Sequence, residues 1–261
     1  MKQNQYSTNL TKAQWKVIKP LLPVETRGAP ARIARKRIVD ALWFLVVTGL
    51  QWRFLPSRFP AWQTVYYHFR RWSGQGIWRR IHHVLRALVR EKMGRCKHAS
   101  AGCLDSQSVK TSRVGGERGF DNGKKVKGRK RHLLTDTQGL ALEVLVTPAN
   151  FSENAGAKAL WRRAGRRRGP AKRVRRVWVD QGYKPGLVHW CRTRYGLEVQ
   201  IVETPVDQKG FAVQPRRWVV ERTFAWLSPC RRLSLDYEKL TSHSETWIWI
   251  ALARLLLRRL A

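Results

Sequence analysis

The chain has 261 residues, 43% of them hydrophobic and 10% aromatic, which suffices for one sizeable core or two small ones and argues against intrinsic disorder. Lysine and arginine number 52 against 17 aspartates and glutamates, and the formal charge of +35 indicates a polyanionic partner, either nucleic acid or an anionic membrane. A membrane is disfavoured, because the apolar run from Ala41 to Val47 is too short to cross a bilayer and Arg254 interrupts the apolar C-terminus.

Two further features bear on the compartment. Residues 1–10 lack the apolar core of a signal peptide, so we expect a cytoplasmic protein. The four cysteines are scattered without a Cys-x-x-Cys pair, which is typical of reduced thiols rather than of zinc ligands or a disulfide framework.

The first part of the chain is predicted to be helical. Apolar spacing and capping signals, such as Thr11 before the first helix and Gly49 after the second, predict four helices over about 11–22, 35–48, 61–69 and 77–92. Short connections and basic polar faces favour a helix-turn-helix-like DNA-binding module over the alternative, a plain helical bundle. The exposed basic residues expected there are His68, Arg70, Arg71, Arg79 and Arg80.

The periodicity changes between Gly94 and Ser100, which predicts a boundary. Beyond it we expect a strand, a hairpin, a helix, a strand, a helix, a strand and two helices, over 101–105, 129–147, 153–168, 174–180, 185–195, 197–201, 216–231 and 244–260. This order predicts a mixed α/β sheet flanked by helices, not a βαβ repeat.

Three carboxylates differ from the others. Asp105 and Asp180 are each expected to end a core strand, and Glu221 lies on a predicted helix close to its buried stripe. For Glu153 and most remaining acids, solvated or ion-paired roles suffice, and Asp136 fits a hairpin turn. Each of the three could instead pair with an arginine, but together they can coordinate two Mg²⁺ ions about 4 Å apart and support in-line displacement at phosphorus.

Several blocks of sequence resemble bacterial insertion-sequence transposases of the Asp-Asp-Glu class, in the family conventionally numbered five, which is related to the family numbered four. The blocks run from Ala61 to Phe69, Leu104 to Thr111, Gly123 to His132, Asp180 to Tyr183 and Arg217 to Trp226. The resemblance implies a helical DNA-binding domain over 1–95 and a ribonuclease H-like catalytic domain over 96–261.

The resemblance also implies the chemistry. Asp105, Asp180 and Glu221 would be the catalytic and metal-binding residues, with Mg²⁺ as the cofactor and Mn²⁺ as a substitute. The partners would be double-stranded DNA, both element ends and target, and a second copy of the chain on that DNA. Such a protein would associate with the nucleoid. The interval between Asp180 and Glu221 is too short for the large β insertion of some relatives, so a compact core is expected.

The sequence departs from the family pattern at three positions. The family's helix signature spaces its residues as Y-x₂-R-x₃-E-x₆-K, and Arg217 and Glu221 fit it. Gln214 stands at the Tyr position and Ser228 at the Lys position, so a phosphate contact is expected from Arg231 or Arg232 instead. Close relatives usually have Gly where this chain has Gln181.

Runs of basic residues without acids predict contacts to the DNA backbone. One run occupies a predicted loop and the start of the strand that follows it. It comprises Lys124, Lys125, Lys127, Arg129, Lys130 and Arg131. The spacing Gly123-x₄-Gly128 does not continue with the Lys-Ser/Thr of a phosphate-binding loop, so no nucleotide cofactor is expected.

The sequence thus predicts a metal-dependent transposase that cleaves at its element ends and joins the 3′-hydroxyls to target DNA. Two alternatives stay open. One is a nuclease that hydrolyses DNA without strand transfer, and the other is a catalytically inactive DNA-binding or regulatory derivative.

Overall fold

The structure is a computed structural model that describes residues 6–23, 33–166, 169–202 and 218–260. The chain divides into two compact units, which are treated separately below. The first comprises Met1–Gly94, Leu227–Leu235 and Ser242–Ala261, and the second Arg95–Trp226 and Asp236–Thr241. The sequence boundary near residue 95 coincides with a unit boundary, but the C-terminal helix belongs to the helical unit. A single cut at 95 therefore does not describe how the chain is divided.

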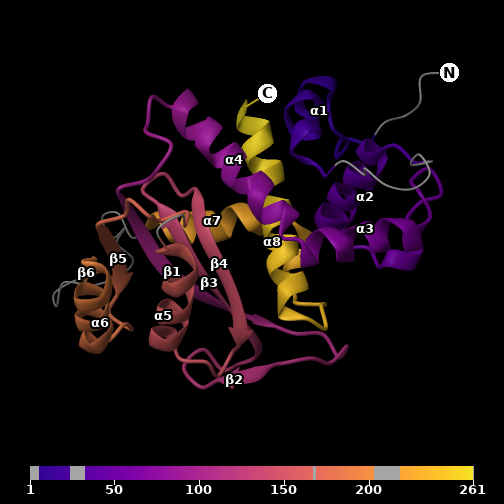
Figure 1. The fold of residues 1–261 in the computed structure, drawn as a ribbon. Coiled ribbons are helices and arrows are strands. Elements are labelled where there is room, and N and C mark those ends of the chain that lie inside the picture. Colours follow the sequence, from indigo (N-terminus) through magenta and orange to yellow (C-terminus); the bar gives the residue numbers. More distant parts are fainter. Residues whose placement is uncertain (1–5, 24–32, 167–168, 203–217, 261) are drawn as a thin grey trace. The chain divides into compact units, whose positions relative to one another are not determined.

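The first unit is helical (Figure 1). Its elements are α1 (Lys12–Ile18), η1 (Lys19–Leu21), α2 (Arg35–Thr48), η2 (Trp52–Phe54), α3 (Trp62–Gly74), α4 (Ile77–Lys92), η3 (Arg231–Leu233) and α8 (Thr241–Leu260). The capping signals act as predicted: Thr11 and Gln14 form a capping box, and Gly49 ends α2 in the left-handed conformation. None of the described helices is both long and apolar enough to cross a membrane.

Aromatic residues from distant parts of the chain build the core of this unit. The Trp247 ring of α8 stacks on Phe69 of α3 at 4.7 Å between centroids, and Trp52 lies 5.6 Å from Trp247. The Arg232 guanidinium covers the Trp247 ring at 4.7 Å and donates to the Leu50 carbonyl at 2.9 Å. Arg232 is therefore buried and used for packing.

The second unit contains a six-stranded mixed sheet. Its strands are β1 (Ala101–Lys110), β2 (Gly119–Asp121), β3 (Val126–Asp136), β4 (Ala141–Pro148), β5 (Arg176–Asp180) and β6 (Glu198–Val202). The strand order is β2-β3-β1-β5-β6, with β4 also paired to β3. β1, β3 and β4 are antiparallel neighbours, whereas β5 and β6 run parallel to β1. A three-stranded meander followed by two parallel crossover strands is the ribonuclease H-like arrangement, which confirms the predicted fold class.

Helices complete the second unit (Figure 1). They are α5 (Glu153–Ala164), α6 (Pro185–Tyr195) and α7 (Trp218–Leu227). Leu104 of β1 and Val177 of β5 share a buried cluster with Leu160 of α5 and Leu187 of α6. Because side chains alternate across a sheet, Cys103, Asp105, Trp178 and Asp180 point to the opposite face.

One predicted strand is longer than expected. The sequence predicts that β1 ends at Asp105, but it continues for five residues to Lys110. The reason is its partner β3, which pairs with β1 from Asp136 to Gly128, opposite Gly102 to Lys110. Asp105 therefore lies inside a strand, although the pairing of β1 with β5 ends earlier, at Cys103.

Candidate active site

Asp105 and Asp180 lie on neighbouring parallel strands. Ala101 pairs with Arg176 and Cys103 with Trp178, and Asp105 and Asp180 each lie two residues beyond the last of these pairs. Paired residues of parallel strands point to the same face, and neighbouring strands lie about 4.8 Å apart. Both carboxylates therefore face the same side at the edge where β5 ends. Both are half-buried, and Asp105 Oδ1 accepts the Ser106 amide at 2.7 Å.

The N-terminus of α5 meets the turn after Asp180. Ser152 caps α5 by accepting the Ala155 amide at 3.2 Å, which puts Glu153 in its first turn. Asn154 Oδ1 accepts the Lys184 amide at 3.0 Å, and Asp180 Oδ1 accepts the Gly182 amide at 3.0 Å. The helix start and the turn are thus tied together by hydrogen bonds.

Glu153 lies at this junction, next to Asp180. A Cβ at Gly182 would lie 3.0 Å from Glu153 Oε2 and 3.1 Å from Asp180 Oδ1, so both carboxylates border the same point. The Ser106 hydroxyl, one residue after Asp105, donates to Glu153 Oε1 at 2.9 Å. The expected ion-paired role of Glu153 is met by Lys124, and the structure also brings Glu153 next to Asp180.

Tyr183 is a buried neighbour of these acids. Its side chain is buried, at 1% exposure, and belongs to the core cluster between the sheet and α5 and α6. Burial raises the pKa of Tyr183 well above its usual value, and the nearby charges of Asp105, Glu153 and Asp180 raise it further. The hydroxyl is therefore protonated at neutral pH, and the three acids that act on it lie on three different elements.

A basic turn borders the same acids. Lys124 Nζ donates to the Ser106 carbonyl at 3.0 Å and to Glu153 Oε1 at 3.4 Å. Asp121 positions this turn by accepting the Gly123 and Lys124 amides at 3.1 and 3.0 Å. Burial alone would raise the pKa of Asp121, but hydrogen bonds from Ser108, the Lys124 amide and Lys130 hold it at about 2.

Glu221, the third predicted acid, is half-buried on α7. The Thr223 hydroxyl donates to the Gly139 carbonyl at 2.8 Å, and Arg222 donates to the Gln138 carbonyl at 3.1 Å. These bonds dock α7 on the β3–β4 turn, which Asp136 shapes as predicted by accepting the Gln138 and Leu140 amides. Asp180 and Glu153 thus border one point beside Gly182, Asp105 lies on the neighbouring strand, and Glu221 lies on a helix held at the hairpin.

The predicted DNA-binding residues divide into two groups. Lys124 and Lys125 are exposed in the basic turn over 122–125, Lys127 is exposed at the start of β3, and Arg231 is exposed in η3. Arg129, Lys130 and Arg131 are buried on β3, at 0%, 6% and 4% exposure, and so are not available at the surface. Burial lowers the pKa of Arg131 to about 10. Arg217 and Gln214 lie outside the described residues.

The sequence patterns do not identify Glu153, Tyr183 or Asp121 as site residues. A local signal exists for Glu153, because Ser152-Glu153 is a typical helix start. Tyr183 lies within a block that resembles the family, but its burial follows from the tertiary fold. Nothing in the local sequence shows that Asp121 returns to β1 through Ser108.

The donor set suits a hard divalent cation. Mg²⁺ binds through one or two carboxylates together with water and substrate phosphate oxygens, and Asp105, Asp180 and Glu153 supply such oxygens. Among the residues that the structure describes, no three histidine, cysteine, aspartate or glutamate side chains form a ready-made metal site. Completion of a coordination sphere by phosphate and water fits this arrangement.

Comparison with known proteins agrees with the fold. Residues 97–256 match the family model described as transposase DDE domain, and residues 10–82 match putative transposases of the IS4/5 family. A putative transposase for insertion sequence element IS402 of Burkholderia cepacia is 33% identical over 116 residues, covering 43% of this chain and 54% of the relative. An uncharacterized 16.2 kDa protein of the same element is 30% identical over 83 residues, covering 29% of this chain and 56% of the relative.

The chain spans about half the length of the curated relatives it matches. No solved structure matches it. Since the DDE-domain model covers more than half of the chain and the sheet has the expected topology, the chain belongs to the DDE transposases of insertion sequences, of the IS4/5 type.

Proposed function

We propose that the protein is a DNA transposase that binds the inverted-repeat ends of an insertion sequence, cleaves there, and joins the 3′-hydroxyl ends to target DNA. The observation that carries this proposal is the placement of Asp105 and Asp180 on one face of adjacent parallel strands, in a chain of the DDE family. Two carboxylates on one face of neighbouring strands, in a chain of charge +35, favour a cation-dependent reaction on a polyanion.

Asp105, Asp180 and Glu221 would hold Mg²⁺, with Mn²⁺ as a substitute. When bound, the ions would activate the attacking oxygen and stabilise the leaving oxygen of an in-line displacement. Support for Glu221 comes from its helix. The next two residues of α7, Arg222 and Thr223, hold the helix to the β3–β4 turn by hydrogen bonds. That anchoring limits how far Glu221 can move along the sheet.

The basic turn would hold the DNA backbone at the acids. Lys124 lies 3.4 Å from Glu153, and Lys125 and Lys127 are exposed beside it. An ammonium group is a strong donor to a phosphate oxygen. Asp121 fixes the turn, so these lysines would meet the phosphates next to the scissile bond. Arg217 and Arg231 are further candidate phosphate contacts.

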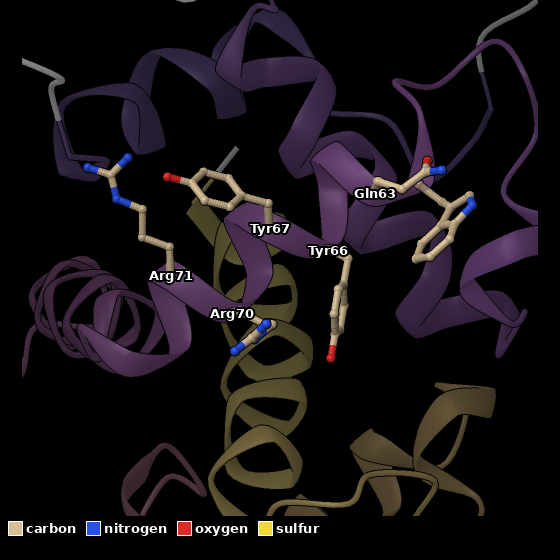
Figure 2. A pocket seen from close by; sticks show the side chains of 6 residues that line it. Gln63, Tyr66, Tyr67, Arg70 and Arg71 are labelled. Atoms are coloured by element: carbon tan, nitrogen blue, oxygen red, sulfur yellow. The ribbon is translucent and has the colours of Figure 1, made fainter. Parts of the chain in front are cut away.

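The helical unit would bind the element ends through α3. Trp62, Gln63, Tyr66, Tyr67, Arg70 and Arg71 of this helix line a surface hollow of about 550 Å³. Figure 2 shows Gln63, Tyr66, Tyr67, Arg70 and Arg71 projecting from successive turns of α3. A helix that carries amide, aromatic and guanidinium groups on one face suits contacts to both base edges and phosphates in a major groove. Because both element ends must be held together, the active species would be a dimer on DNA.

The deciding experiment incubates the full chain with duplex DNA that carries the repeats flanking its gene, with Mn²⁺, and measures cleavage and strand transfer of a pre-cut end. We expect both activities in the wild type and loss of at least 100-fold in Asp105→Asn, Asp180→Asn and Glu221→Gln. Glu198→Gln is the matched control, because Glu198 is an exposed carboxylate on β6 that pairs with Arg176. It should behave as the wild type.

The other outcomes are informative. Cleavage without joining of the pre-cut end would identify a nuclease. DNA binding without metal-dependent cleavage would identify an inactive regulatory derivative. Cleavage that persists in Glu221→Gln would remove Glu221 from the mechanism while leaving the two aspartates in place.

A further inference from the structure

Glu153 is the first residue of α5, and the mechanism proposed above does not use it. Its carboxylate nevertheless borders the same point as that of Asp180. A Cβ placed on Gly182 would lie 3.0 Å from Glu153 Oε2 and 3.1 Å from Asp180 Oδ1. The side chain is partly buried, at 22% exposure. A carboxylate placed against a second carboxylate raises the energy of the charged pair unless a cation lies between or beside them.

A buried hydroxyl indicates that this group of acids has a further partner. Tyr183 is fully within the core, and among the residues that the structure describes its hydroxyl oxygen has no hydrogen bond of normal length and angle. The hydroxyl lies in the field of Asp105, Glu153 and Asp180, with the Ser106 hydroxyl nearby. An unsatisfied polar atom in this position is costly unless water or an ion-bound ligand completes its hydrogen bonding.

The protein cation next to Glu153 is Lys124. Its ammonium lies 3.4 Å from Glu153 Oε1 and is 45% exposed, so the pair is long and open to solvent. An exposed pair of this kind contributes little to stability. Lys124 also donates to the Ser106 carbonyl, and this bond does not require the Glu153 charge. A simple surface ion pair therefore does not account for the placement of Glu153 against Asp180.

We propose that Glu153 is an additional metal-binding carboxylate, which holds a divalent ion together with Asp180, while the Tyr183 hydroxyl donates to a ligand of that ion. This inference rests on the proposed function, since it assumes that the site takes Mg²⁺ or Mn²⁺. Two carboxylates, water and a substrate phosphate form a normal Mg²⁺ coordination set. Helix α5 supplies the rigid mount, because its cap at Ser152 and the Asn154–Lys184 bond fix its first turn to the Asp180 turn.

The test measures Mn²⁺ binding to the full chain, without DNA, from the loss of the free-ion paramagnetic resonance signal. We expect Glu153→Gln to weaken Mn²⁺ binding about tenfold, the size typical for loss of a group that supports a metal site. Glu153→Asp keeps the charge and should retain part of the affinity. Glu198→Gln, an exposed carboxylate elsewhere in the sheet, should bind Mn²⁺ as the wild type does.

Lys124→Gln separates metal binding from ion pairing. If Glu153 serves the metal, removing the neighbouring ammonium should leave Mn²⁺ affinity unchanged or increase it. If Glu153 serves only Lys124, the Glu153→Gln and Lys124→Gln proteins should lose the same thermal stability and neither should change Mn²⁺ binding, which would overturn the inference. Circular dichroism melting of every variant reports folding.

The failure of this inference is distinguishable from failure of the proposed function. Weak Mn²⁺ binding in Asp180→Asn with wild-type binding in Glu153→Gln would reject Glu153 alone. Absence of Mn²⁺ binding in the wild type, with or without DNA, would reject both.

Discussion

Arg129 and Asp236 form an ion pair of 3.0 Å in which the side chains are 0% and 1% exposed. The same guanidinium donates to the backbone carbonyls of Glu117, Glu238 and Lys239 at 2.7 to 2.9 Å. Asp236 Oδ1 also accepts the Glu238 amide at 3.0 Å. One buried arginine on β3 thus fixes the segment before α8 to the sheet.

Arg129→Met should therefore destabilise the protein strongly. The change leaves the buried charge of Asp236 without its guanidinium and three carbonyls without their donor, so we expect the free energy of unfolding to fall by about 3–5 kcal/mol. Urea unfolding followed by circular dichroism measures it. Arg176→Met is the control, because Arg176 pairs with Glu198 at 2.8 Å with both side chains about half exposed. That change should cost less than about 1 kcal/mol, and equal losses would contradict this account.

This ion pair explains why the sequence was a poor guide to the basic strand. Counting charge along 124–131 predicts a run that faces DNA. Lys124, Lys125 and Lys127 are exposed, as that prediction requires. Arg129 and Lys130 are buried because Asp236 and Asp121, which lie elsewhere in the sequence, return to neutralise them. Charge composition records how many cations a segment has, but tertiary contacts decide which of them reach solvent.

Elements set by local rules were predictable. The Thr11 cap, the Gly49 stop and the helical periodicity of α4 each depend on residues within a few positions, and all three were confirmed. The length of β1 was not predictable, since it depends on pairing with β3. The place of Glu153 was missed for the same reason, because its neighbours Ser106 and Asp180 approach it only in the folded sheet.

Gly156→Ala should reverse the usual effect of this substitution in a helix. Replacing glycine by alanine within a helix normally stabilises it by about 1 kcal/mol. Here a Cβ would lie 2.0 Å from His132 Cε1 on the buried face of α5, so the ring or the helix must shift. We expect a net loss of about 1–3 kcal/mol in the free energy of unfolding, measured in urea.

Gly186→Ala on α6 provides the comparison, because a Cβ there would have no atom of the described residues within 4 Å. It should be neutral or slightly stabilising. Adding His132→Ala to Gly156→Ala removes the clash, so the double variant should be less destabilised than the sum of the two single variants. Additive losses would show that the two residues do not compete for space.

The stability of the sheet unit should fall in acid partly through His132. Burial, followed by the charges of Lys130 and Lys124, lowers the pKa of His132 to about 3. The unfolded chain, with an ordinary histidine pKa near 6.5, therefore binds a proton between about pH 6.5 and 3 that the folded chain does not. Stability from this group is present above pH 6.5 and is lost as the pH falls, by up to about 1.4 kcal/mol per pH unit.

His132→Gln removes this titration and keeps a polar group opposite Thr147, to which His132 lies hydrogen-bonded at 3.0 Å. Urea unfolding at pH 7, 6 and 5 should give a shallower loss of stability for this variant than for the wild type. His189→Gln, which alters an exposed histidine on α6, should keep the wild-type slope. Identical slopes for all three proteins would mean that His132 titrates normally in the folded state.

The α3 surface predicts two separable effects on DNA binding. Arg70→Gln should weaken binding to the element's repeat and to a scrambled duplex alike, and should reduce the slope of log affinity against log salt by about 1, because one phosphate contact is lost. Gln63→Ala should instead weaken binding to the repeat by about 5- to 100-fold and leave binding to the scrambled duplex almost unchanged, since an amide that reads a base edge contributes about 1–3 kcal/mol of discrimination.

Arg192→Gln, at an exposed arginine on α6, controls for the loss of one positive charge. Fluorescence anisotropy at several salt concentrations measures both quantities. If Gln63→Ala weakened both duplexes equally, α3 would contact the backbone without reading sequence, and another element would have to recognise the repeats.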